Sequence, residues 1–251
     1  TCGTTSIIVY LNGNTCWTAC SGDSRAVLGQ LKGGKYVAQD LSEDCKPDTP
    51  SETVRIRQCG GVVSPSVGGR PSRVWANGRI GLAMSRSLGD GECKRFGVIA
   101  DPEIKHFTLK PSAETEDPKT GRKIDGDGDK FIIVASDGVW EFISSEEAIQ
   151  LIFKHRHKGA TVACKELIAE SARRWRKEEG DYRDDITAIV VFLPIFSVLS
   201  GEPSIKSGSC APRPKPSSPC VRRCARALLS GHASPAVAGT RSSRGSSRST
   251  L

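Results

Sequence analysis

The sequence of 251 residues lacks the signatures of several common protein classes. No apolar run reaches the roughly 20 residues that a membrane-spanning helix needs, so we expect no membrane span. The sequence also has no glycine-rich Walker loop, no zincin motif and no Gly-x-Ser-x-Gly motif. These absences argue against an integral membrane protein, a P-loop nucleotide hydrolase, a zinc protease and a serine hydrolase.

The ten cysteines follow neither a disulfide framework nor a zinc-site spacing. They are scattered along the chain, and no signal-peptide pattern precedes them. The closest pairs, Cys16 with Cys20 and Cys220 with Cys224, have no matching His or Cys pair elsewhere. We therefore expect reduced thiols and an intracellular protein, in the cytoplasm or the nucleus.

The net charge of +8 belongs to the end of the chain. Residues 1–200 carry equal numbers of basic and acidic side chains, whereas residues 201–251 contain nine basic residues and only Glu202. Their Ser, Pro, Arg and Gly content cannot offset the entropy of ordering. We predict a partial globular domain at residues 1–193 and a disordered basic tail at 194–251. Such a tail can contact nucleic acid or acidic lipid through nonspecific charge, but we expect no specific nucleic-acid partner.

The apolar patterns predict antiparallel strands first and helices later. Residues 5–11 and 15–21 are rich in β-forming residues and flank Asn12-Gly13, a strong hairpin signal. The continuous apolar run at 131–135 is typical of a strand that is covered on both faces. The polar stretch at 110–129 is interpreted as a solvated loop, because its Asp-Gly repeats do not fit a calcium-binding EF-hand loop.

Two helices are predicted near the end of the globular part. Ser144 and Glu147 form a capping box that opens the first helix, which we expect to end near Phe153. The second helix is predicted at residues 161–177, with Leu167 and Trp175 on its packing face.

Three carboxylates share one sequence context. Asp23, Asp137 and Asp184 each lie at the end of a predicted strand, next to Gly, a small polar residue or another acid. Acids at strand ends can converge at one edge of a sandwich, and oxygen ligands without His or Cys select Mg²⁺ or Mn²⁺. Turns also favour Asp and Gly for backbone reasons, so each residue taken alone is better explained as a turn residue, and the three together only suggest a site.

Seven motifs in a fixed order resemble those of the type 2C metal-dependent Ser/Thr protein phosphatases. They cover residues 1 to about 193, and their order makes the resemblance specific. The motifs are Cys2-Gly3-Thr4-Thr5, Ser21-Gly22-Asp23-Ser24-Arg25-Ala26, Cys45-Lys46-Pro47 with Arg55-Ile56 and Gly60-Gly61, residues 82–90, Ala100-Asp101-Pro102-Glu103-Ile104, residues 131–140, and Asp184-Asp185-Ile186-Thr187.

The resemblance implies an α+β fold, a four-layer α-β-β-α sandwich of two antiparallel sheets flanked by helices. It implies hydrolysis of phosphoserine and phosphothreonine in protein substrates by water activated at two Mn²⁺ or Mg²⁺ ions. Asp137 resembles the metal-binding Asp of the family's Ser-Asp-Gly motif, and Asp184 the first Asp of its Asp-Asn-Ile-Thr motif. Asp23 resembles the acid linked to a third, weaker ion. We expect a monomer.

The sequence also departs from the family pattern. Asp185 stands where Asn is commoner, and Cys45 stands where His is usual. The family's Asp-Gly-His-Gly motif and its phosphate-contacting Arg are expected upstream of Thr1, so we expect an amino-terminally truncated domain without the central bridging Asp. The alternative is a catalytically inactive binding module. A cysteine phosphatase is rejected, because Cys220 and Arg226 lie in the predicted tail rather than between a strand and a helix.

Overall fold

The computed structural model describes residues 2–110, 112, 114–116, 120–121 and 123–193. All of them belong to the first of the chain's two units, Thr1–Pro203. The predicted tail at 194–251, including Cys220 and Arg226, lies outside the described residues. A domain boundary at residue 193 therefore stays a prediction.

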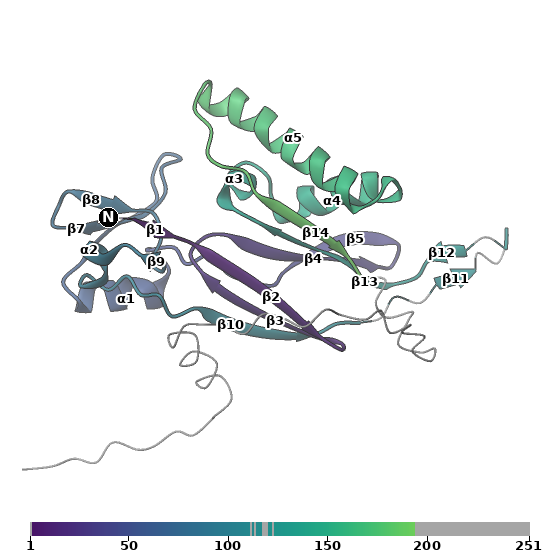
Figure 1. Cartoon of the computed structure of the whole chain (residues 1–251), viewed down its shortest axis with the longest axis horizontal. Helices are drawn as coiled ribbons and strands as arrows, with labels where there is room; N and C mark the ends of the chain where they lie inside the picture. The colour runs from purple at the N-terminus through teal and green to yellow at the C-terminus, as the bar shows by residue number, and fades with distance from the viewer. Residues whose placement is uncertain (1, 111, 113, 117–119, 122, 194–251) are drawn as a thin grey trace, which may run out of the picture. The chain divides into compact units, whose positions relative to one another are not determined.

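Two antiparallel sheets form the centre of the fold (Figure 1). One sheet has the strand order β10-β3-β2, and the other has the order β14-β13-β4-β5. Asn12 pairs with Thr15, so the predicted hairpin is confirmed. The strands are β2 (Ser6–Asn12), β3 (Thr15–Ser21), β4 (Arg25–Lys32), β5 (Lys35–Asp40), β10 (Glu103–Thr108), β13 (Gly128–Ala135) and β14 (Ala188–Phe192).

Alternating side chains of β13 fill two different core layers. Ile132 and Val134 pack between the two sheets, while Phe131 and Ile133 face the helices. Burial on both faces is what the continuous apolar run predicted, because each face of the strand meets a packed layer.

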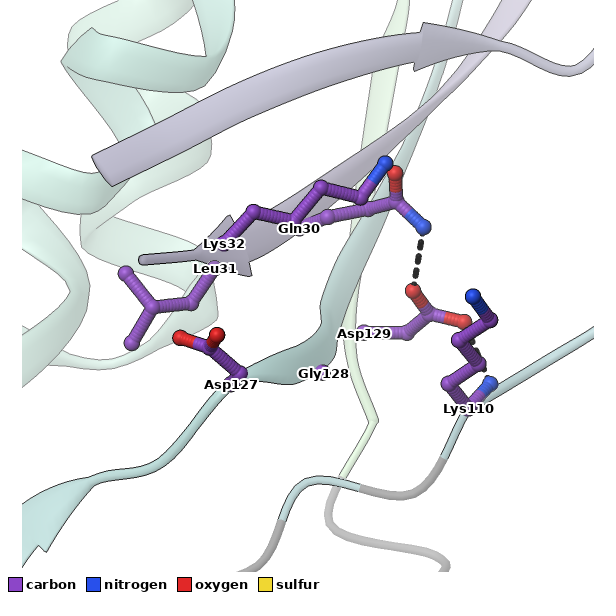
Figure 2. A pocket seen from close by; sticks show the side chains of 7 residues that line it. All are labelled: Gln30, Leu31, Lys32, Lys110, Asp127, Gly128 and Asp129. Carbon is purple, nitrogen blue, oxygen red and sulfur yellow. Dashed lines mark hydrogen bonds between the residues drawn. The ribbon is translucent and has the colours of Figure 1, made fainter. Parts of the chain in front are cut away.

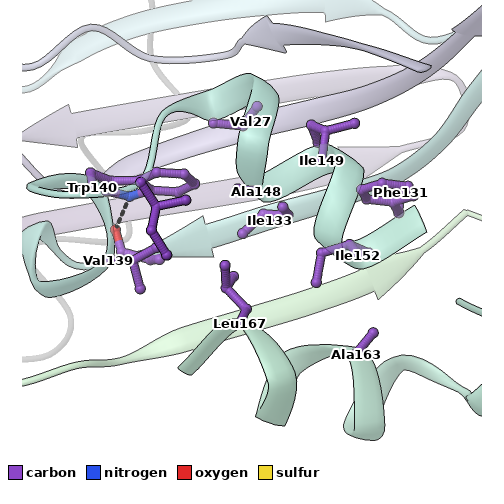
Figure 3. Close-up of a cluster of buried hydrophobic side chains, with 12 residues drawn as sticks. Val27, Phe131, Ile133, Val139, Trp140, Ala148, Ile149, Ile152, Ala163 and Leu167 are labelled. Carbon is purple, nitrogen blue, oxygen red and sulfur yellow. Dashed lines mark hydrogen bonds between the residues drawn. The ribbon is translucent and has the colours of Figure 1, made fainter. Parts of the chain in front are cut away.

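One outer face of the sandwich is covered by the helices α4 (Ser145–His155) and α5 (Ala160–Glu179). Figure 3 shows Ile149 and Ile152 of α4 and Leu167 of α5 gathered over the sheet. The capping box of Ser144 and Glu147 is present at the start of α4. The short helix α3 (Asp137–Trp140) follows β13 directly, and the 3₁₀ helix η1 (Arg156–Lys158) links α4 to α5.

The opposite outer face, on β10-β3-β2, presents large apolar side chains to solvent. Ile8, Tyr10 and Ile104 are 58%, 59% and 65% exposed, and Trp17 lies against His106 with ring centroids 4.9 Å apart. The two sheets and the helical layer confirm the expected α+β class. The described residues form one helical layer, so the second helical layer of the expected α-β-β-α sandwich does not lie among them.

A smaller lobe of short elements adjoins the sandwich. Glu52 lies buried at its base, where it bonds to Arg55, Ser85 and Arg86. Burial would raise the pKa of Glu52, but these hydrogen bonds lower it to about 2. The elements are β1 (Gly3–Thr4), α1 (Pro50–Gln58), β6 (Val62–Ser64), β7 (Arg73–Ala76), β8 (Ile80–Leu82), β9 (Leu88–Gly89) and α2 (Gly91–Lys94).

The prediction of a solvated loop through Asp129 is wrong at its carboxyl-terminal end. The stretch contains β11 (Glu114–Glu116) and β12 (Lys123–Asp125), and Asp129 lies in β13 with 1% exposure. Figure 2 shows its carboxylate between two donors: the Gln30 side-chain amide and the Lys110 backbone amide, each at 2.6 Å. The pattern predicted that the charged Asp129 side chain would be exposed to water. It is buried instead, and these two hydrogen bonds compensate for the loss of water.

Candidate metal centre

The sheet register brings the three predicted acids to one edge of the sandwich. Ala135, the last residue of β13, pairs with Arg25 at the start of β4 and with Ala188 at the start of β14. Asp23, Asp137 and Asp184 each lie within four residues of one of these paired positions. Residues far apart in sequence are therefore neighbours at this edge.

Backbone contacts join the segments of Asp137 and Asp184. The Ser136 hydroxyl donates to the carbonyl oxygen of Asp185 at 3.0 Å and accepts from the Thr187 amide at 3.1 Å. The Ser136 amide donates to the Thr187 carbonyl at 3.0 Å. These bonds hold the end of β13 against the chain that enters β14.

Helix α5 supports the same place from outside. The carbonyl oxygen of Gly138 accepts from the Ser171 hydroxyl at 2.5 Å and from the Trp175 indole at 2.7 Å. Ser171 and Trp175 are both buried on one side of α5. The position of Asp137 is thus fixed by a rigid element as well as by its own strand, which is the support that a functional side chain requires.

The electrostatics of Asp137 mark it as the centre of the acidic group. Burial, followed by the negative charges of Asp23 and Asp184, raises the pKa of its carboxyl to about 6. Lys46 and a backbone hydrogen bond at Gly138 oppose this effect. A cation bound beside Asp137 would offset the repulsion between these negative charges and would therefore stabilise the ionised carboxylate.

Asp23 has a cationic partner within the chain. It is 3% exposed, and the Lys46 ammonium donates to its Oδ2 at 2.6 Å. Burial alone would lower the pKa of Lys46, but Asp23, Asp44 and Glu141 raise it. Lys46 therefore places one positive charge among the acids.

The donor set suits a hard divalent cation, although it is not a closed cage. In the part of the chain that the structure describes, no three His, Cys, Asp or Glu side chains are placed to hold one metal ion. Mg²⁺ usually keeps several waters and binds proteins through one or two carboxylates. Asp137 and Asp184 fit that mode, because both supply oxygen and the acids around Asp137 favour a bound cation there.

Sequence reasoning missed two charged residues of this edge. Lys46 belongs to the motif Cys45-Lys46-Pro47 but had no predicted role, and Glu141 lies one helical turn after Asp137. A spacing of four residues from Asp137 could have indicated that Glu141 lies near it on a helix. Nothing in the sequence indicated that Lys46 lies beside Asp23. Arg86 has a structural role in its ion pair with Glu52 at 2.8 Å.

Comparison with known proteins gives the family. The family model described as Protein phosphatase 2C matches residues 1–180. The chain belongs to the protein phosphatase 2C family. Probable protein phosphatase 2C 72 of Arabidopsis thaliana is 38% identical over 197 residues, which cover 76% of this chain and 54% of the relative. Probable protein phosphatase 2C 34 of the same plant is 35% identical over 214 residues, covering 81% and 52%.

Solved structures agree with the phosphatase 2C fold. A serine-threonine phosphatase 2C from Toxoplasma gondii matches with a TM-score of 0.62 and 22% identity, over 75% of this chain and 57% of that chain. The chain spans about half the length of the curated phosphatase 2C relatives it matches. No helix among its described residues is long and apolar enough to cross a membrane.

Proposed function

We propose that this chain belongs to a protein serine/threonine phosphatase that hydrolyses phosphoserine and phosphothreonine in proteins at a Mn²⁺ or Mg²⁺ site. The observation that carries the proposal is the group of Asp23, Asp137 and Asp184 at one sandwich edge in a chain of the phosphatase 2C family. Two bound ions, with a third near Asp23, fit the resemblance.

The chain's own residues would bind and orient the metal. When bound, a divalent ion lowers the pKa of a coordinated water and neutralises phosphate charge. Asp137 and Asp184 would hold it, because the hydrogen bonds of Ser136 with Asp185 and Thr187 keep the two segments together. Lys46 would orient the carboxylate of Asp23 and limit the net negative charge that an incoming phosphate meets.

A second candidate function is a phosphatase-like binding module without activity. Two observations favour it: residues 1–251 contain no Asp-Gly-His-Gly sequence, and no three described acids form a closed ligand group. The presence of Asp137 and Asp184 favours the enzyme, because a binding module has no physical need for two adjacent carboxylates.

A monomeric state and an intracellular location are also part of the proposal. The free thiols among the described cysteines support the intracellular location.

Phosphate release from a phosphothreonine peptide with Mn²⁺ tests the proposal. We expect little or no release by residues 1–251 alone, and Mn²⁺-dependent release when an amino-terminal segment carrying the Asp-Gly-His-Gly motif is joined to them. Asp137→Asn should abolish that release, while Asp185→Asn, one residue from Asp184, should retain it. If the protein with the added amino-terminal segment folds but has no activity, the result would favour the binding module. If its activity survives Asp137→Asn, the result would contradict the metal site.

A further inference from the structure

Two buried thiols meet beside the loop that carries Asp23. Cys20 lies near the end of β3 and is 1% exposed, and Cys45 follows β5 and is 3% exposed. The sulfur of Cys45 lies 3.9 Å from the carbonyl oxygen of Cys20, and the two thiols are also within hydrogen-bonding reach of each other. Their closeness is a property of the fold, because 24 residues separate them in the sequence.

Both cysteines are bonded to the same loop. The Cys20 sulfur lies 3.6 Å from the carbonyl oxygen of Gly22 and 3.3 Å from that of Ser24, both within reach of its thiol proton. The Cys45 amide donates to the Gly22 carbonyl at 2.8 Å. Asp23 lies between these two carbonyl groups. Any change in the thiol pair therefore acts on the backbone that positions Asp23.

The segment of Cys45 reaches Asp23 by a second route. Lys46, the next residue, donates to the Asp23 carboxylate at 2.6 Å. The two cysteines thus lie where the loop of Asp23 and the segment of Lys46 are held together.

We propose that Cys20 and Cys45 form a reversible disulfide on reaction with hydrogen peroxide, and that this bond fixes the loop of Asp23 to the segment of Lys46. The reaction needs only the two thiols and peroxide. The Cys45 thiolate attacks one peroxide oxygen, the O–O bond breaks, and sulfenic acid and hydroxide form. The Cys20 sulfur then displaces hydroxide from that sulfenic acid, its proton joins the leaving hydroxide as water, and two electrons have passed from the sulfurs to the peroxide.

The surroundings shift the pKa values of the two thiols in opposite directions, which gives each sulfur a different role in the reaction. The hydrogen bond from Cys20 lowers the pKa of Cys45, and the backbone at Gly22 and the charge of Arg86 add to this against the opposing effect of burial. The same hydrogen bond, together with burial, raises the pKa of Cys20. Cys45 is thus the attacking thiol and Cys20 the resolving one. Cys16 and Cys93 are also buried, but burial raises the pKa of both.

Peptide mapping of the full 251-residue chain tests the bond. The reduced chain is treated with hydrogen peroxide without metal, its free thiols are blocked, and the digest is analysed by mass spectrometry. We expect a linked peptide pair that joins Cys20 to Cys45 and is released by dithiothreitol. The pair should be absent in Cys45→Ser and retained in Cys93→Ser, the matched buried control. Unlinked Cys20 and Cys45 in the oxidised wild-type chain would overturn the proposal.

Hydrogen exchange supplies a second readout that needs no substitution. Oxidation should slow amide exchange at residues 21–25 and 45–46 and leave α5 unchanged. Unchanged exchange in a chain that carries the linked pair would overturn the claim that the bond fixes the loop. Neither readout depends on bound metal, so the result is separate from the result for the proposed phosphatase.

Discussion

Gly138 packs so closely on Asp185 that a methyl group added to Gly138 would lie 2.3 Å from the Asp185 carbonyl oxygen. Non-bonded carbon and oxygen atoms do not approach that closely, so the backbone would have to shift. The contact explains why glycine follows Asp137: its missing side chain lets the start of α3 meet the segment that enters β14. Asp137 and Asp184 become neighbours as a result.

Gly138→Ala should therefore separate the two segments. We expect a loss of about 1 to 3 kcal/mol in the free energy of unfolding, the usual range for forcing an extra carbon into a packed site. Urea unfolding of the metal-free chain measures it. Gly91→Ala is the control, because an added methyl group there meets nothing within 4 Å. Equal stabilities of the two variants would mean that the close contact is not maintained in solution.

Asp137 should make the metal-free chain less stable as pH rises. An ordinary Asp has a pKa near 4, and in the folded chain the pKa of Asp137 is raised to about 6. The folded state thus holds the proton more tightly than the unfolded state, so this contribution to stability is present below about pH 4 and is lost between about pH 4 and 6.

Asp137→Asn removes this charge. After allowance for partial exposure, the variant should exceed wild type in stability by on the order of 1 kcal/mol near pH 7, and by much less near pH 4. Urea unfolding at both pH values in the presence of a chelator measures the difference. Asp185→Asn, which removes a carboxylate from the neighbouring segment, is the matched control. A constant difference between Asp137→Asn and wild type would refute the raised pKa.

Lys46→Met should leave the buried charge of Asp23 without its partner. We expect a loss of about 1 to 3 kcal/mol, below the usual cost of breaking a fully buried pair because Lys46 is partly exposed. Added Mn²⁺ should raise the melting temperature of this variant more than that of wild type, since the ion replaces the lost positive charge. Lys105→Met breaks a more exposed pair with Glu43 and should cost under about 1 kcal/mol. An equal Mn²⁺ effect on wild type and Lys46→Met would count against a shared site.

Asp129→Ala should destabilise the chain although Asp129 lies at the end of β13 opposite to Asp137. The substitution leaves the Lys110 amide and the Gln30 side-chain amide without their acceptor. Two unsatisfied buried donors should cost about 2 to 4 kcal/mol, measured by urea unfolding. Asp127 accepts from the Gly33 amide at an exposed position, so Asp127→Ala should cost less than about 1 kcal/mol. Similar losses for both variants would contradict the assigned burial.

Most of the strands and the helices could be predicted from the sequence. Alternation and capping are local signals, as in the Asn12-Gly13 hairpin and the capping box at Ser144. Asp137 and Asp184 were predicted as metal ligands from the motifs that they share with the family. The residues alone could not show that the acids meet, because Asp next to Gly is also typical of a turn.

The remaining features depend on contacts between distant segments. Lys46 meets Asp23 only because the chain after β5 returns to the end of β3, and Asp129 is buried only because Gln30 faces it. On α5, the apolar pattern predicted Leu167 and Trp175 correctly, but it could not predict that Ser171 is buried between them through its bond to Gly138. A polar residue gives no sign in the sequence that its partner lies in another element.

The central claim is that Asp137 and Asp184 hold a divalent ion at this edge. Titration of the 251-residue chain with Mn²⁺, followed by the electron paramagnetic resonance signal of free Mn²⁺, tests it most directly. The account predicts binding by wild type and Asp185→Asn, and affinity weakened by about tenfold or more in Asp137→Asn and Asp184→Asn. Equal binding by all four proteins, or no binding by folded wild type, would contradict it.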